Sequence, residues 1–551
     1  MTAARRGGTL TVVGAGDADN LDPALAVHTV TRGILRACTR QLVTYRAGRD
    51  PRRAGEVVAD MATEVPTRAN GRLDATGQEY VFTIRLGVRW DTPDGFRQVT
   101  AADLARGLKR LAHPAAPGPA LTYFTRTIRG LDRLCAELTE AEDVLGFLEA
   151  AEVEGIRVLD ERTVALLTIG PAVDFLNILA LPSATPAPVE YAGYAPGSPE
   201  ITRGPRSNGP YRVENYLPGK EILLGRNPAW DPATDDVRAA HIDGVAVRMG
   251  VSEADAFRLV DSGEVDMLWD IQPMTAELPR LLAAADPRLE IHPAGLFSPY
   301  LVVNLRSPNE GGATSRLGVR RAVSVALDRS AVSRVWGGPR LNDLTWRILP
   351  PLCSAYTPDS PVPDGPPGGD PVLARELLAE AGYPNGVTLR MVHRDRDIHP
   401  ESVHEMGVAL ARAGIRLVPV PVSITELFTR YFGSTATAAR GEWDLAFTGW
   451  EPDWHGDNAR TYLQPLFESA GSWNLGFYRS AEVDRLLAAG RAATSREAAN
   501  AAYRGVEAEV LRDMAVVPVL FAHQYWFHSP RVLGWEPYPV LNGDLANLWL
   551  G

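Results

Sequence analysis

Lysine is almost absent from this chain. Lys109 and Lys220 are the only two among 56 basic residues, so a lysine Schiff base or an SxxK nucleophile has almost no candidates. Acidic residues number 67, which gives a net charge of -11 and a pI near 5.5. A groove for duplex nucleic acid carries a basic surplus, so we expect no nucleic-acid partner.

Cysteine and long apolar runs are also scarce. Cys38, Cys135 and Cys353 are odd in number and far apart, which excludes a disulfide framework and a CxxC metal pair but allows one disulfide. The sequence contains no run of about 18 apolar residues, so it predicts no membrane-spanning helix. The N-terminal MTAARRGGTLTVVG has no apolar signal core. We therefore expect either an extracytoplasmic, cell-surface-associated protein whose signal segment has been trimmed, or a cytoplasmic protein.

The motifs of common enzyme classes are missing. The sequence has no GxSxG, GxxxxGK[ST] or HExxH motif, and no GxGxxG follows a predicted strand. His393, His399 and His404 lie close together, but their spacing matches no standard zinc site, and the acidic residues among them favour a solvated loop before a helix. We therefore expect no enzyme activity, no cofactor and no bound metal.

The length of 551 residues predicts two or three domains. Thr100 and Asp103 form a capping-box variant at a helix start, and hairpins are expected around Asp160-Glu161 and Pro218-Gly219. The segment 316–336 predicts one helix of about twenty residues. Helix–strand alternation after residue 370 predicts an α/β domain with a mostly parallel sheet.

The stretch EWDLAFTGWEPDWHGDN, residues 442–458, concentrates acidic and aromatic side chains. Trp443, Leu445 and Phe447 alternate with smaller or polar residues, which predicts a strand that Gly449 and Pro452 loosen into a loop. Tryptophans and carboxylates just after the end of a strand are typical of a binding surface for a cationic ligand that also has an apolar part. An edge strand with a core tryptophan and a solvated turn explains the same pattern.

Taken in order, eight segments resemble the solute-binding proteins of peptide ABC importers, the oligopeptide/dipeptide-binding family (family 5). Each motif is weak alone, but their order covers nearly the whole chain. Actinobacterial relatives occur in antibiotic gene clusters, including that for clavulanic acid, and the preference for arginine over lysine is typical of such GC-rich genomes. The segments are GGTLTV…LDPAL, the turn at 90–95, TAADLARGLKRL, SNGPYRV…NPAW, GEVDM, VVNL…LGVRRAVSVALDR, ARELLAEAGYP and WDLAFTGWEPDW.

The resemblance implies an α/β fold of two lobes, similar to the periplasmic binding proteins (class II, three-domain variant). A hinge of two strands would join the lobes, with a ligand cleft between them, and closure would be hinge bending near residues 292–297 and 515–521. The implied division is domain I at residues 1–45, 187–293 and 515–551, the inserted domain II at 46–186, and domain III, the C-terminal lobe, at 294–514.

The resemblance also implies a site. Gly449, Trp450 and Asp453 match a Gly-Trp-x-x-Asp segment that lies in the family's cleft. Asp453 would bind the ligand's α-ammonium, and Trp450 would pack on the ligand or floor the pocket. Tyr123 is expected at the same end of the ligand.

A peptide would be held as an added strand, since backbone hydrogen bonds tolerate many side chains. The backbone expected to bond it belongs to Gly449, Glu451 and the segment His28, Thr29 and Val30. The family often continues with Asp-Pro after the aspartate, whereas Trp454, His455, Gly456 and Asp457 follow here. We include Trp454, His455 and Asp457 in the predicted site.

The implied function is non-catalytic binding of oligopeptides, or of related basic amine ligands, by a monomer that delivers them to an ABC permease. Glu451, Asp453 and Asp457 favour a cationic ligand such as an arginine-containing peptide or a basic amino-acid derivative. No arginine lies just before Gly449, so the partner of a ligand's C-terminus is unassigned. One alternative is an enzyme or biosynthetic accessory that reuses the fold on a small metabolite. The other is a nickel- or haem-binding relative using His455 or the His393/His404 region.

Overall fold

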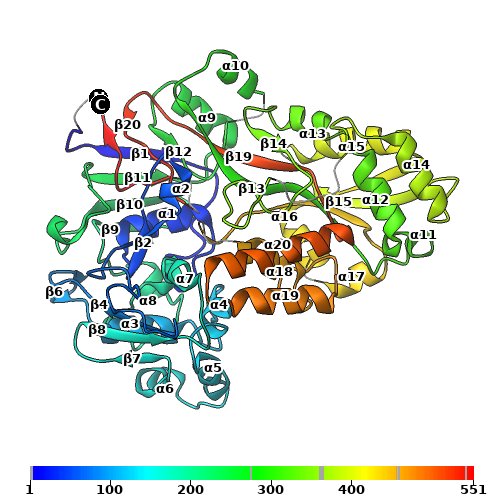
Figure 1. The fold of residues 1–551 in the computed structure, drawn as a ribbon. Helices are drawn as coiled ribbons and strands as arrows, with labels where there is room; N and C mark the ends of the chain where they lie inside the picture. The colour runs from blue at the N-terminus through cyan, green and yellow to red at the C-terminus, as the bar shows by residue number, and fades with distance from the viewer. Residues whose placement is uncertain are drawn as a thin grey trace.

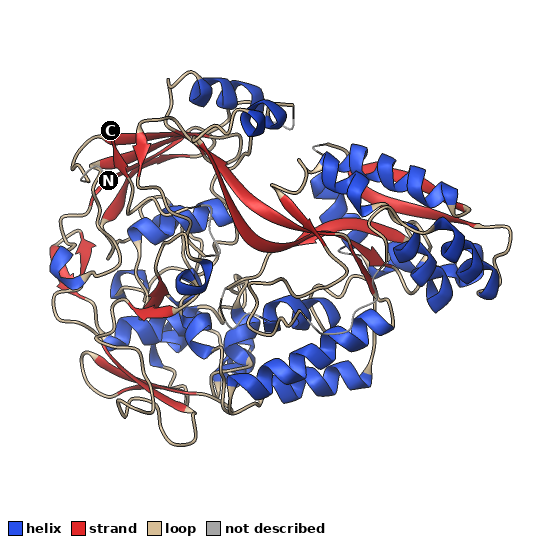
Figure 2. Cartoon of the chain, turned by 45° about the horizontal axis from the view of Figure 1, so that its top comes forward, coloured by secondary structure: helices blue, strands red, loops and turns tan. Residues whose placement is uncertain are grey.

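The computed structural model describes residues 4–273, 276–358, 365–396, 398–432, 434–454, 456, 459–539 and 543–551. Two bulky halves are joined by a long twisted ribbon of two strands, and both chain ends lie in the same half (Figures 1 and 2). No helix in these ranges is both long and apolar enough to cross a membrane. We keep the names domains I, II and III for the parts built around the sheets described next.

Domain I is built on a five-stranded sheet with the order β12-β1-β11-β10-β9. β1 (Thr9–Val13) lies parallel to β11 (Gly244–Arg248) and β12 (Met267–Leu268), so the first strand of the chain becomes central to a sheet completed much later. β9 (Tyr211–Leu217) and β10 (Glu221–Arg226) form the hairpin predicted at Pro218-Gly219. The other elements are α1 (Thr29–Cys38), α8 (Pro199–Thr202), η3 (Pro232–Thr234), α9 (Glu253–Asp261), α10 (Leu278–Ala283), β20 (Val532–Leu533) and β21 (Trp549–Leu550).

Domain II packs helices against the three-stranded sheet β4-β8-β7. β7 (Ile156–Val158) and β8 (Thr163–Leu167) confirm the predicted hairpin. At the start of α3 (Ala101–Arg110), Thr100 and Asp103 form the predicted capping box. The other elements are β2 (Val43–Tyr45), α2 (Pro51–Ala54), β3 (Val57–Ala59), β4 (Glu79–Thr83), β5 (Arg89–Thr92), β6 (Gly95–Gln98), α4 (Leu121–Thr125), α5 (Leu131–Thr139), α6 (Val144–Ala150), α7 (Phe175–Leu179), η1 (Pro182–Ala184) and η2 (Val189–Tyr191).

The sheet of domain III has the order β14-β19-β13-β17-β15-β16, with β18 also paired to β13. β15 (Val387–Arg394) runs parallel to β16 (Ile415–Val422) and β17 (Leu445–Trp450), whereas β13 pairs antiparallel with β17, with β18 (Val516–Pro518) and with β19. β14 (Asn342–Leu344) pairs antiparallel with β19. The prediction of a mostly parallel sheet was wrong. Helix–strand alternation gives only the parallel pairs among β15, β16 and β17. The antiparallel pairs of the sheet all include β13 or β19, the two strands that run on into domain I.

The predicted helix over residues 316–336 is two helices, α12 (Leu317–Ala326) and α13 (Arg329–Val335). Leu327 is extended, and the Asp328 carboxylate accepts a hydrogen bond from the Ala331 N–H, so this aspartate starts a new helix instead of continuing the old one. The other helices are α11 (Asn309–Gly312), η4 (Ala313–Ser315), α14 (Pro371–Glu380), α15 (His399–Arg412), α16 (Ile424–Glu426), η5 (Leu427–Phe432), α17 (Thr435–Ala439), α18 (Ala459–Phe467), α19 (Ala481–Arg491) and α20 (Arg496–Arg512).

The joining ribbon consists of β13 (Leu289–Val303) and β19 (Leu520–Phe527) (Figure 2). Their register is interrupted between His292 and Leu296, which pair with Gln524 and Ala522 respectively. An interruption in a ladder is a natural place for bending. On β13 the interruption coincides with the hinge predicted at residues 292–297. On β19 it falls just beyond the hinge predicted at residues 515–521, because β18 already lies inside the sheet of domain III.

Candidate functional site

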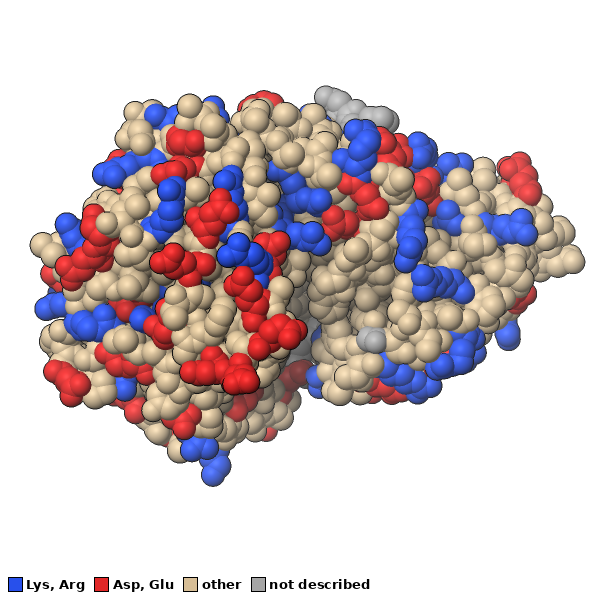
Figure 3. All heavy atoms as spheres, turned by 90° about the horizontal axis from the view of Figure 1, so that it is seen from below, with Lys and Arg blue, Asp and Glu red and all other residues tan. Residues whose placement is uncertain are grey.

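The end of β17 lies against the ribbon that joins the two halves, since Trp450 pairs with Phe297 of β13. Figure 3 shows the surface hollowed between the two halves. Pairing of β17 with β13 continues to Trp450, which lies opposite Phe297, whereas pairing with β15 is recorded only at Leu445 and Ala446. Among the described residues, the last part of β17 therefore has no ladder partner on its β15 side. Such an edge can accept an extended peptide backbone.

The predicted alternation along this strand was wrong. Leu445, Ala446 and Phe447 are all buried, because β17 is an interior strand covered on both faces. Gly449 does not end the strand, which continues to Trp450. A Cβ at Gly449 would lie 2.3 Å from the Ser298 Oγ, so only glycine fits this close approach to β13.

Asp453 lies where all three domains meet. Its Oδ2 accepts a hydrogen bond from the Tyr123 hydroxyl of domain II at 2.6 Å, and its Oδ1 lies 3.9 Å from an Nη1 of Arg32 in domain I. The Asp453 side chain is 29% exposed, so a ligand can still reach it. Burial, followed by the nearby Asp453 charge, raises the pKa of Tyr123 well above its usual value, so Tyr123 remains a hydrogen-bond donor.

Trp454 has no exposed surface and packs in the core of domain II. Its ring meets Tyr123 edge-on, with centroids 4.9 Å apart. A residue of domain III thus anchors the segment that carries Asp453 to domain II. In this arrangement Trp454 holds the site together and presents no surface to a ligand.

Trp450 is partly exposed at the end of β17. Its indole Nε1–H donates to the Thr461 carbonyl at 2.8 Å, which fixes the ring. Trp473 meets it edge-on at 5.9 Å, and Phe428 meets Trp473 at the same distance. Since Trp473 and Phe428 are also exposed, the ring of Trp450 begins an aromatic row on domain III.

Glu451 accepts a hydrogen bond from the Gln524 side chain of β19 at 2.9 Å. Its side chain is exposed at the surface, although the polypeptide around it still lowers its hydration. This partial removal from water raises the pKa of Glu451 to about 7, although the Arg32 charge acts in the opposite direction. Glu451 therefore changes charge near neutral pH.

We expect amine ligands to bind more tightly as the pH rises from about 6 to 8, because ionised Glu451 attracts a cation. An ammonium favours the charged form of Glu451, so binding should release a proton from its carboxyl group. The Kd should change by no more than about tenfold over this range, since a tenfold change corresponds to a shift of one unit in the pKa of Glu451 on binding. Calorimetry in buffers of different ionisation enthalpy measures both quantities, and Glu451→Gln should flatten the profile. An unchanged slope in that variant would contradict the assignment.

The segment His28, Thr29 and Val30, predicted to bond the backbone of a peptide, leads into and begins α1. The His28 N–H donates to the Asp19 carboxylate at 3.2 Å, and its carbonyl accepts from the Arg32 N–H at 3.0 Å. Thr29 and Val30 form the first turn of α1 and are half-buried. The backbone of His28 is therefore already bonded within domain I, which leaves it little capacity for a peptide.

His455 and Asp457 lie outside the described residues. Gly456, between them, approaches domain II closely, since a Cβ there would lie 2.5 Å from the Gly55 carbonyl oxygen. Gly456 thus lies at the junction between domains II and III.

The histidines considered as metal ligands have separate surroundings. His393 is buried with its Nδ1 bonded to the Arg394 carbonyl at 2.6 Å, His399 packs edge-on against Phe447 at 4.9 Å, and His404 is exposed. In the ranges that the structure describes, no three His, Cys, Asp or Glu side chains group in a way that could hold a metal ion.

Arg32, Asp174, Arg460 and Gln524 were not predicted from the sequence. Arg460 of α18 lies 3.2 Å from Asp174 of domain II, both side chains are buried, and the guanidinium lies over the Tyr123 ring at 5.7 Å. No local motif marks these residues. Their role depends on contacts between segments that are distant in the sequence.

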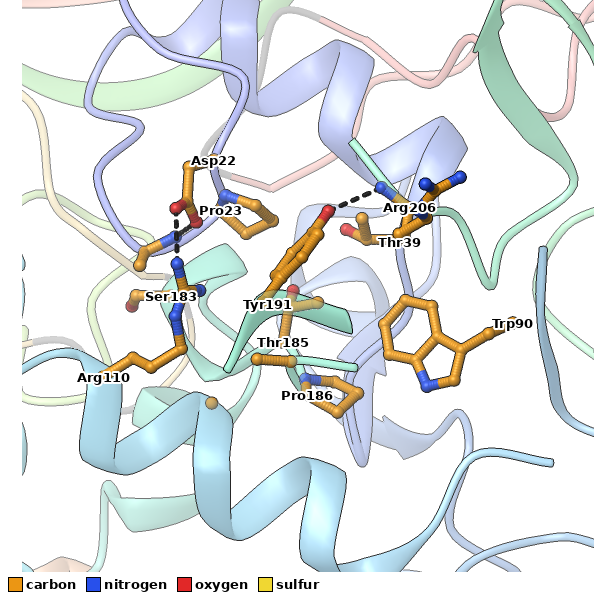
Figure 4. A pocket seen from close by; sticks show the side chains of 13 residues that line it. Asp22, Pro23, Thr39, Trp90, Arg110, Ser183, Thr185, Pro186, Tyr191 and Arg206 are labelled. Atoms are coloured by element: carbon orange, nitrogen blue, oxygen red, sulfur yellow. Dashed lines mark hydrogen bonds and ion pairs between the residues drawn. The ribbon is translucent and has the colours of Figure 1, made fainter. Parts of the chain in front are cut away.

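A second set of polar residues, at the junction of domains I and II, closes around a cavity of about 10 Å³ (Figure 4). Asp22 pairs with Arg110 at 2.9 Å, and the Tyr191 hydroxyl accepts from the Arg206 N–H at 2.6 Å. A volume of this size accommodates about one water molecule at most. These contacts hold the two domains together, and the cavity between them is too small for a peptide.

Comparison with known proteins concerns the family and the fold of the whole chain. Residues 56–474 match the model of the bacterial extracellular solute-binding proteins, family 5 Middle. The chain is 25% identical over 490 residues to the periplasmic oligopeptide-binding protein OppA of Salmonella typhimurium, covering 86% of this chain and 82% of that protein.

Solved structures share the fold. The clavulanic acid biosynthesis oligopeptide binding protein 2 superposes with a TM-score of 0.86 at 26% identity, over 99% of this chain and 96% of that chain. DppA from Helicobacter pylori, solved with the peptide STSA, gives a TM-score of 0.74 at 21% identity, over 99% and 98%. The fold is thus the two-lobed α/β fold of periplasmic binding proteins. This chain belongs to family 5 of the bacterial extracellular solute-binding proteins.

Proposed function

We propose that this protein captures oligopeptides or related amine ligands between its lobes and delivers them to an ABC permease, without catalysis. The observation that carries the proposal is Asp453, an accessible carboxylate at the meeting point of three domains, bonded by Tyr123 at 2.6 Å. A carboxylate in a closing cleft is a strong partner for an α-ammonium, because the local dielectric falls as water leaves. The names of OppA and DppA support peptides as the ligand class.

The end of β17 would hold the ligand's backbone. Its edge beyond Ala446 has no pairing with β15 among the described residues, so an extended chain could add to the sheet there. Gly449 and Glu451 lie at this edge, and Trp450 would pack against the ligand. Closure would follow from bending of the ribbon near His292 and Gln524.

A basic ligand such as arginine or an arginine-containing peptide fits the charge of the site. Glu451 and Asp453 lie near each other and near Arg32, so these three charges are acidic on balance when Glu451 is ionised. We further propose that the protein acts as a monomer outside the cytoplasm, as the word periplasmic in the names of its relatives suggests. The name of the clavulanic acid protein favours a biosynthetic accessory role as the second candidate.

A thermal-shift screen with di- to pentapeptides, arginine and unrelated metabolites tests the proposal. A ligand present at about 100 times its Kd should stabilise the folded protein by about 2.7 kcal/mol. Peptides or basic amines should raise the melting midpoint, and the same ligands N-acetylated should raise it much less. If only an unrelated metabolite stabilises the protein, the biosynthetic alternative replaces the importer function.

A further inference from the structure

Arg32 of α1 has an unusual environment for a shielded guanidinium. Its side chain is only 15% exposed, yet its recorded polar contacts within the described chain are a 3.9 Å ion pair with Asp453 and a 3.5 Å contact from Nε to the Ala26 carbonyl. Both are too long for strong hydrogen bonds. Arginine offers five N–H donors, so most of the bonding capacity of Arg32 is unused.

A neighbouring arginine has closer partners, although its Nε has no hydrogen-bond partner among the described residues. Arg36, one turn later on α1, bonds the Thr44 hydroxyl at 3.1 Å, the Tyr45 carbonyl at 3.3 Å and the Asp544 carboxylate at 3.1 Å. Shielded cationic groups normally have such partners. Arg32 faces Asp453 across the interlobe opening, so the partner it lacks would come from a ligand and would be an anion.

We infer that Arg32 and Asp453 together recognise the zwitterionic head of an α-amino acid, with Asp453 and Tyr123 on the ammonium side and Arg32 on the carboxylate. The inference rests on the proposed ligand site and names its substrate class. The two α-groups of an amino acid are adjacent, since two bonds of about 1.5 Å separate the nitrogen from the carboxyl carbon. Arg32 and Asp453 lie 3.9 Å apart, so the two side chains can reach the two adjacent α-groups of one ligand.

The N-terminus of a peptide matches this pair less well. It supplies the ammonium for Asp453 but places a neutral carbonyl, not a carboxylate, next to it. A hydrogen bond from arginine to a carboxylate is roughly twice as strong as one between neutral groups and can be bidentate. Arg32 therefore discriminates in favour of free amino acids and of derivatives that keep both α-groups.

The charges around the pair indicate a basic side chain. The two negative charges of Asp453 and ionised Glu451 exceed the single positive charge of Arg32. Arg460 and Asp174, close to Tyr123, form an ion pair with no net charge. A zwitterionic head adds no net charge, so the excess negative charge remains for the ligand's side chain. A basic amino acid neutralises the group, whereas an acidic one adds repulsion.

Titration calorimetry with L-arginine, L-arginine amide, agmatine and Nα-acetyl-L-arginine tests the inference. Arginine should bind at least tenfold more tightly than its amide or agmatine, which lack the carboxylate, and also more tightly than the acetyl derivative, which lacks the ammonium. Arg32→Gln should abolish the preference of arginine over its amide, and Arg32→Lys should retain part of it. Arg133→Gln is the control, because Arg133 is 77% exposed on α5, outside the site.

The results separate this inference from the proposed function. The inference is wrong if arginine and its amide bind equally to the wild type, or if Arg32→Gln weakens the binding of both by the same factor. Arg32 would then only pair with Asp453 between the lobes, and the proposed capture of amine ligands would still hold. If no peptide or amine binds at all, both fail. The wild-type ligand series decides the question even if Arg32→Gln does not fold.

Discussion

Asp453→Asn weakens the binding of ligands with a free α-ammonium by about 30-fold or more, which corresponds to the roughly 2–5 kcal/mol lost when one partner of a desolvated charge pair is removed. The Asp453 carboxylate accepts a hydrogen bond from Tyr123 at 2.6 Å and faces Arg32 at 3.9 Å. Asparagine keeps the shape and can still accept from Tyr123. It has no charge for the ammonium.

Matched ligands make this prediction specific. A free peptide and its N-acetylated form should differ strongly in Kd with the wild type and little with Asp453→Asn, as measured by calorimetry. Tyr123→Phe is the companion variant. It removes the hydroxyl donor but keeps the ring against Trp454, so it should cost less than the charge itself. Equal losses for free and acetylated ligands in Asp453→Asn would place the ammonium elsewhere.

Asp60→Ala lowers the free energy of unfolding by about 3–5 kcal/mol, because it leaves buried arginines without their main counter-charge. Asp60 lies just after β3 and bonds Arg238 of domain I at 2.8 Å and Arg40 at 2.7 Å, and all three side chains are almost fully buried. Asp235 also pairs with Arg238 at 3.2 Å, so removing Asp60 leaves one carboxylate to serve two guanidinium groups.

The same group predicts a dependence of stability on pH. Burial alone would raise the pKa of Asp60, but the Arg238 and Arg40 charges outweigh it and hold that pKa below its usual value. Because the unfolded pKa is about 4, ionised Asp60 stabilises the protein above that pH. The contribution is lost as the pH falls through the folded pKa.

Denaturant unfolding followed by circular dichroism measures the effect. Asp236→Ala is the control: its side chain is 61% exposed and forms a surface pair with Arg85, so its loss should change the free energy of unfolding by no more than about 0.5–1 kcal/mol. If Asp60→Ala and Asp236→Ala unfold at the same denaturant concentration, the buried network does not stabilise the junction of domains I and II as we expect.

Local sequence determined much of the secondary structure. The capping box of Thr100 and Asp103 and the hairpins at Asp160-Glu161 and Pro218-Gly219 depend on neighbours within a few residues, so pattern alone predicts them. The helix break at Asp328 was missed because an aspartate inside an apolar pattern either caps a new helix or points to solvent, and the pattern does not distinguish the two. The order of motifs indicated the family.

The stretch at residues 442–458 shows the limit of such reasoning. Sequence alone indicated a strand followed by an acidic, aromatic segment and, by resemblance, singled out Asp453 as the amine partner. Tertiary structure decided that β17 is an interior strand, that Trp454 is an anchor in domain II, and that Arg32 faces Asp453. The physical reason is that burial and charge pairing depend on which distant segments meet, and residues 32, 123 and 453 are brought together only when the three domains fold around one ribbon.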